Sequence, residues 1–121
     1  MTIAVWIVSG LVALLYLMAG GRKVITPEAA LPATFPFVEA TGVPLLRAIG
    51  ALEILGAIGV IVPALTGIAP ILTPIAAIGL ALIQVGAIIL HVRRKEYGSL
   101  AFNAVLLVLP AFVAVARLAG Y

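Results

Sequence analysis

The chain has 121 residues, of which 65% are hydrophobic and 9% charged, and its formal net charge at pH 7 is +3. This composition lies far outside the range of soluble globular domains, so the sequence predicts an integral membrane protein without a separate soluble module. The absence of cysteine and the single histidine exclude zinc-thiolate and iron-sulfur sites and a bis-histidine haem from one chain. Nucleic-acid binding is not indicated either, because the charges lie at helix ends, where they face lipid headgroups.

Four apolar runs are each close to the roughly 20 helical residues needed to cross the hydrocarbon of a bilayer. They cover residues 3–21, 45–62, 71–92 and 99–118. The sequence therefore predicts an all-α fold, an antiparallel four-helix bundle that forms one transmembrane domain over residues 1–121. The first run is expected to remain as a span in the mature protein, because its basic pair, Arg22 and Lys23, follows the apolar residues instead of preceding them.

The connection between the first and second spans is expected to lie along the membrane interface. Its sequence, VITPEAALPATFPFVEATGVPLL, is too apolar for a disordered linker and is divided by prolines. Thr26 and Pro27 are typical of a helix start, as N-cap and first-turn proline, and Gly42 offers a left-handed stop. We expect one or two short amphipathic helices, with Phe35 and Phe37 facing lipid or the bundle. An irregular surface loop is the alternative.

Basic residues set the expected orientation. Three of them flank the first loop and three fill the third, whereas the opposite side has only Arg117 and the terminal amine. Because basic residues favour the cytoplasmic side, the sequence predicts a multi-pass protein of the inner (plasma) membrane with both termini outside the cytoplasm.

Glu53 interrupts the second span, in the stretch RAIGALEILGAIG. On a helix it shares a face with Gly50 and Gly56, so it points where another helix can approach closely. At about 1.5 Å per residue from the inferred cytoplasmic ends, four polar residues fall in one layer roughly 7 to 12 Å deep: Tyr16, Glu53, Gln84 and Asn103. An unpaired carboxylate there is costly, so Glu53 is expected to be protonated, hydrogen-bonded within this layer, or paired with Lys23 or Arg47.

The polar layer has two interpretations. Its groups can hold the helices together by hydrogen bonds without any ligand. They can equally form a site that binds a polar molecule or transfers a proton through Glu53, because intramembrane ionisable residues often mark functional sites. Under the second interpretation no residue is catalytic or metal-ligating, and the candidate ligand-binding residues are Glu53, Tyr16, Gln84, Asn103, Lys23 and Arg47. His91 and the Arg-Arg-Lys run that follows it are expected to be interfacial residues that fix the topology.

Four segments occur in a recognisable order: AGGRKV at the end of the first span, a proline-rich loop ending in TGVP, RAIGALEILGAIG with its central acid, and HVRRKEYGSLAFNAVLLVLPAF. This set covers most of the chain and resembles the DoxX-like family of small four-helix membrane proteins. The resemblance implies a four-helix bundle with Glu53 as its characteristic polar residue and Lys23 and Arg47 at the matching basic positions. The family takes its name from a membrane subunit associated with a thiosulfate:quinone oxidoreductase.

The resemblance implies a non-catalytic accessory protein of a membrane complex, or one that binds a small amphipathic molecule, with a quinone or a lipid as the expected ligand. Expected partners are the lipid bilayer and a membrane oxidoreductase or other membrane protein, and a homo-oligomer is a further option. The alternative is a small proton-coupled multidrug-type transporter that uses Glu53, although such exporters carry their acid in the first helix. An enzyme is disfavoured, because the residues supply no complete acid, base and cofactor set.

Cysteine labelling tests the predicted orientation. In intact cells an impermeant thiol reagent should reach Thr2→Cys and should miss Gly98→Cys in the third loop, and the chain has no cysteine of its own to interfere. The reverse pattern would mean that the basic loops face outwards.

Overall fold

The computed structural model describes residues 1–121 as helices joined by short connections, without a strand. Four long helices correspond to the four predicted spans: α1 (Thr2–Ile25), α4 (Val43–Thr66), α5 (Leu72–Arg93) and α6 (Leu100–Leu118). Each of them is long and apolar enough to cross a membrane. The predicted all-α membrane bundle is therefore confirmed.

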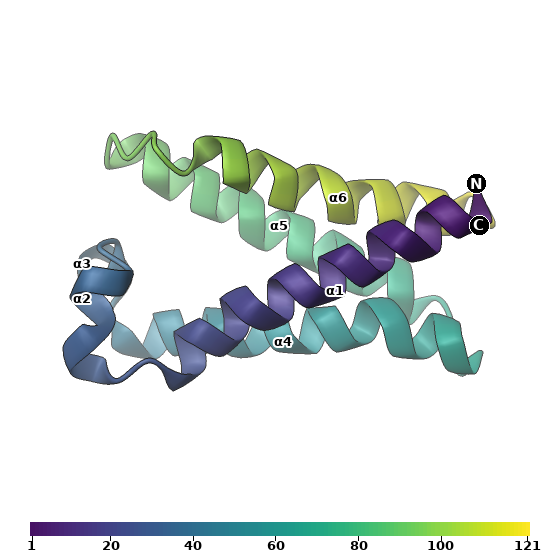
Figure 1. Ribbon diagram of the computed structural model, residues 1–121, viewed down its shortest axis with the longest axis horizontal. Coiled ribbons are helices and arrows are strands. Elements are labelled where there is room, and N and C mark those ends of the chain that lie inside the picture. Colours follow the sequence, from purple (N-terminus) through teal and green to yellow (C-terminus); the bar gives the residue numbers. More distant parts are fainter.

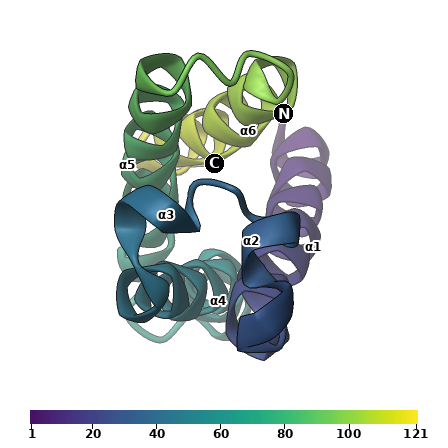
Figure 2. The same ribbon diagram turned by 90° about the vertical axis from the view of Figure 1, so that its left-hand side faces the viewer.

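The long helices form a ring in which each packs against two others, in the order α1, α4, α5, α6 (Figure 2). Both termini lie at one end of the bundle, and the two basic loops lie together at the opposite end (Figure 1). Towards these loops the pair α1 and α4 diverges from the pair α5 and α6 (Figure 1). The two ends of the bundle therefore differ in how closely their helices pack.

The connection between α1 and α4 folds into three short helical turns, η1 (Glu28–Ala30), α2 (Leu31–Thr34) and α3 (Val38–Thr41). We call residues 27–42 the cap segment, because α2 and α3 lie across the end of the bundle (Figure 2). Leu31 and Val38 are buried together with Leu46 of α4, which fixes the segment to the start of that helix. Gly42 ends α3 with a positive φ of 79°, as predicted.

The end of α1 differs from the prediction. Thr26 is not an N-cap: its hydroxyl donates to the Arg22 carbonyl and so completes the last turn of α1, while η1 begins only after Pro27. The other carbonyls of this turn are held by Arg47 of α4, whose Nη1 donates at 3.0, 2.9 and 2.7 Å to the oxygens of Lys23, Val24 and Thr26. A helix C-terminus leaves carbonyls unpartnered and carries partial negative charge, so a guanidinium stabilises it in both respects.

Helices α1 and α4 pack so closely at two glycines that their backbones are in contact. A Cβ atom added at Gly20 would lie 2.6 Å from the Gly50 carbonyl oxygen, and one added at Gly50 would lie 2.6 Å from the Cβ of Lys23. Small residues permit such an approach between transmembrane helices. Two further glycines of α4 allow α5 to pack closely in the same way: Gly56 contacts Leu80, and Gly59 contacts Ala76. The glycine-lined face of α4 is thus a packing face, as predicted.

The main apolar core fills the half of the bundle nearer to the termini. Its buried residues come from all four long helices and include Val12 and Tyr16 of α1, Val60 of α4, Leu80 of α5 and Val113 of α6. The cap segment has only the small separate core described above. The half of the bundle between the main core and the cap segment is therefore the part in which space remains.

Alanine substitutions test the contact between α1 and α4. Gly50→Ala should lower the free energy of unfolding by about 1–3 kcal/mol, because the added methyl group would overlap α1. Gly79→Ala is the matched control, since nothing lies within 4 Å of a Cβ at that position and alanine favours the helix. Thermal unfolding of both variants in detergent measures the difference, and equal melting temperatures would contradict the close contact.

Candidate ligand-binding cavity

A cavity of about 760 Å³ lies under the cap segment, in the half of the bundle that the main core leaves open. All four long helices, the cap segment and the connection between α5 and α6 contribute to its wall. Small-molecule sites have volumes of about 300–1,000 Å³ and mainly apolar walls with a few convergent polar groups. This cavity has that size, and its wall contains such a set of polar groups.

An ion pair between Lys23 of α1 and Glu53 of α4 forms the charged part of the wall. Lys23 Nζ lies 2.8 Å from Glu53 Oε1, and the two side chains are 14% and 3% exposed. At this distance the two groups form an ion pair, and no other group of the chain donates a hydrogen bond to Oε1. Lys23 lies against Gly50 and Glu53 lies against Gly20, so the close contact of the two glycines brings the two side chains together.

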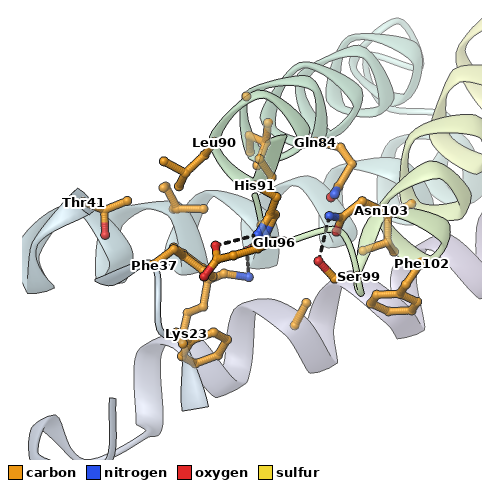
Figure 3. A pocket seen from close by; sticks show the side chains of 18 of the residues that line it. Lys23, Phe37, Thr41, Gln84, Leu90, His91, Glu96, Ser99, Phe102 and Asn103 are labelled. Atoms are coloured by element: carbon orange, nitrogen blue, oxygen red, sulfur yellow. Dashed lines mark hydrogen bonds and ion pairs between the residues drawn. The ribbon is translucent and has the colours of Figure 1, made fainter. Parts of the chain in front are cut away.

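Two carboxamides, of Gln84 on α5 and Asn103 on α6, point into the cavity from neighbouring helices (Figure 3). They are almost completely buried, with 3% and 6% exposure. Asn103 Nδ2 donates to the Ser99 hydroxyl at 3.3 Å, whereas Gln84 has no partner among the residues around it (Figure 3). The Gln84 amide has no hydrogen bond within the chain and faces the cavity, so it is a position where a ligand can supply partners.

Tyr16, the fourth member of the predicted polar layer, lies behind the wall and does not line it. Its hydroxyl donates to the Leu106 carbonyl of α6 at 2.6 Å and lies 3.4 Å from the Leu80 carbonyl of α5. Leu106 also lines the cavity, so Tyr16 joins α1 to the opposite helix pair at the cavity floor.

The structure thus separates the six candidate residues into two groups. Lys23, Glu53, Gln84 and Asn103 line the cavity, whereas Tyr16 and Arg47 do not. Of the two cations considered for Glu53, Lys23 is the one that reaches it, because the Arg47 guanidinium is engaged with the end of α1. Ligand binding by these residues stays a prediction. No group of three or more metal-ligating side chains is present.

Arg94, just after α5, contacts the cap segment, and the sequence did not predict these contacts. It donates to the Pro36 carbonyl at 3.2 Å and lies 3.5 Å from a carboxylate oxygen of Glu39, both in the cap segment. Its Nε also donates to Glu96 Oε1 at 3.1 Å, and that oxygen lies 3.2 Å from Nδ1 of His91. Arg94 therefore ties the cap segment to the connection between α5 and α6. From the sequence, this run of basic residues was expected only to fix the orientation of the protein in the membrane.

Glu96 keeps its charge at neutral pH within this group. Desolvation opposes ionisation, but the hydrogen bonds and charges of Arg94 and His91 outweigh it and lower the pKa of Glu96 below its ordinary value of 4.5. A lowered folded-state pKa means that the contribution of Glu96 to stability is present above the ordinary value and is lost only as the pH falls through the lowered one. Glu96 is therefore an ionised partner of Arg94 at neutral pH.

The two aromatic residues of the cap segment line the cavity and face the bundle. The ring of Phe35 has Arg22 and Lys23 at 5.6 and 5.5 Å from its centroid, within the range of cation-π contacts. Phe37 packs edge-to-face on His91 with 5.3 Å between ring centroids (Figure 3). His91 is thus packed against the cap segment, and its position at the membrane interface stays a prediction.

The model of the DoxX-like family matches residues 7–113, from the first turns of α1 into α6, including the cap segment and the cavity. The chain belongs to the DoxX-like family. This confirms the family inferred from the ordered segments of the sequence. No curated protein and no solved structure was found to match the chain. The cavity is therefore assigned from its own geometry in this DoxX-like protein.

Variants of the ion pair test its role in the stability of this DoxX-like protein. Lys23→Met should lower the free energy of unfolding by about 3–5 kcal/mol, because it leaves a carboxylate buried without a partner. Glu53→Gln should lower it less, because the glutamine oxygen can still accept from Lys23 and Lys23 is the less buried of the two side chains. The double variant Lys23→Met/Glu53→Leu should regain most of the loss. Thermal unfolding in detergent ranks the variants, and a double variant as unstable as Lys23→Met would contradict this account.

Proposed function

We propose that this DoxX-like protein is a non-catalytic accessory protein of the inner (plasma) membrane that binds a small amphipathic molecule, quinone-like or lipid-like, in the cavity. The observation that supports binding is the cavity of about 760 Å³, in which an ion pair and two buried carboxamides converge within a mainly apolar wall. Amphipathic molecules need this combination, since polar groups orient the headgroup and apolar side chains contact the tail.

The position of the cavity fits a ligand that enters from the bilayer. Residues that line it on two sides are also exposed on the outer surface of the bundle: Leu45 of α4 and Leu82 of α5 on one side and Phe102 of α6 on the other. On a membrane-spanning bundle, exposed apolar side chains such as these contact lipid. A molecule dissolved in the membrane can therefore reach the cavity between the helices without passing through water.

The competing function is that of a proton-coupled transporter in which Glu53 exchanges a proton for substrate. The contact between Lys23 and Glu53 favours the accessory role, because each protonation of the carboxylate would leave a mostly buried ammonium group without its partner.

The basic residues at the cap end favour an orientation with that end in the cytoplasm. The partner we propose is a membrane oxidoreductase or another membrane protein, in keeping with the subunit after which the family is named.

Native mass spectrometry of the protein, released from membranes in a gentle detergent, tests the proposed binding. The wild type should carry a bound amphipathic molecule, and Ala87→Phe should lose it, because Ala87 lines the cavity and a phenyl ring there would fill the space. Ala51→Phe is the matched control, since Ala51 is exposed on α4 outside the cavity. Wild-type protein without any bound molecule, or equal loading of the two variants, would contradict the proposal. Co-purification of a second membrane protein, recorded in the same spectra, tests the accessory role.

A further inference from the structure

We propose that the ligand has an uncharged headgroup that both donates and accepts hydrogen bonds, such as a hydroxyl group, and that Gln84 and Asn103 hold it between α5 and α6. This inference rests on the proposed binding function and names the class of ligand. It depends on the charges that face the cavity and on the polar groups that remain without partners there.

The charges inside the cavity compensate one another. Lys23 and Glu53 form one pair at 2.8 Å, and Glu96 is held by Arg94 and His91 at the cap end. An anionic headgroup that approached Lys23 would compete with Glu53, and a cationic headgroup that approached Glu53 would compete with Lys23. Either exchange leaves a buried charge without its partner, which is strongly unfavourable at this depth. An uncharged headgroup avoids both exchanges.

Arg22 is the remaining titratable residue of the wall, and it does not change this balance. Its side chain is exposed and stacks over the outer part of the cap segment, 5.6 Å from the centroid of the Phe35 ring. At that position it faces the headgroup region of the bilayer, where anionic lipids neutralise it. It therefore supplies no charge to the inner part of the cavity, where the carboxamides lie.

The carboxamides offer the hydrogen bonds that such a headgroup needs. Gln84 presents both its oxygen and its amino group, because neither has a partner in the chain, and Asn103 presents its oxygen, because its amino group donates to Ser99. Both side chains point into the same cavity from adjacent helices (Figure 3). A hydroxyl group has one hydrogen to donate, so it can bridge the two side chains by donating to the Asn103 oxygen while it accepts from the Gln84 amino group.

Three amphipathic probes with the same tail test the inference on the purified full-length protein in detergent: palmityl alcohol, palmitate and palmitylamine. Palmityl alcohol should bind, and the two charged probes should bind about tenfold or more weakly, as expected for one exchanged ion-pair contact. Gln84→Met keeps the length of the side chain but loses its hydrogen bonds, and should weaken binding of the alcohol about tenfold. Asn103→Leu provides a second, independent variant in case the first fails to fold.

Thr41→Val is the matched control, because Thr41 lines the cavity at the cap end and its hydroxyl donates to the adjacent Gly42 carbonyl. This variant should bind the alcohol as the wild type does. Charged probes that bind as tightly as the alcohol, or folded Gln84→Met and Asn103→Leu proteins with unchanged affinity for it, would overturn the uncharged-headgroup inference. Because such a result still shows an amphipathic ligand in the cavity, it leaves the proposed binding function in place. Failure of all three probes, with no molecule bound to the protein from membranes, would overturn both.

Discussion

The contact of Gly20 with Gly50 is the constraint on which the candidate site depends. It brings α1 and α4 to backbone distance, so that Lys23 packs against Gly50 and Glu53 packs against Gly20, and the two side chains meet at 2.8 Å. The same approach places Arg47 of α4 on the last carbonyls of α1, which fixes where that helix ends and where the cap segment begins. Larger side chains at the two glycines would move all three cationic and acidic groups apart.

The bundle is divided into a packed half and an open half, and the polar residues differ accordingly. Tyr16 lies at the boundary and bonds to backbone carbonyls of two other helices, so it holds the helices together without a ligand. Gln84 lies on the open side and has no such partner. The two interpretations of the polar layer therefore apply to different residues: interhelical hydrogen bonding accounts for Tyr16, and a binding site accounts for Gln84.

The sequence predicted the helices well because hydrophobic length and glycine spacing are local properties. It also reduced the partners of Glu53 to a short list that contained Lys23. It did not show which of Lys23 and Arg47 pairs with Glu53. Both residues lie near the cap end of their helices, and only the direction of each side chain decides which one reaches the carboxylate. Counting residues placed Tyr16 in one polar layer with Glu53, Gln84 and Asn103, but it did not predict that Tyr16 bonds to backbone carbonyls behind the cavity wall. The role of Arg94 was not predicted, because its contacts with Pro36 and Glu39 join residues far apart in the chain. The cavity was not predicted either, because amino-acid composition does not show where space remains between helices.

The presence of the ion pair itself is an argument about function. A buried salt bridge is seldom more stabilising than well-packed apolar residues of similar volume, so stability alone does not explain an acid and a base in a chain that is 65% hydrophobic. Beside a cavity, however, the pair does what apolar residues cannot: it provides a strong local dipole without net charge. Such a wall can orient a polar headgroup while it disfavours charged ones, and the unpartnered Gln84 amide lies on the same cavity. Under the proposed function, the cavity and the ion pair have one explanation, as parts of a site selective for uncharged amphipathic molecules.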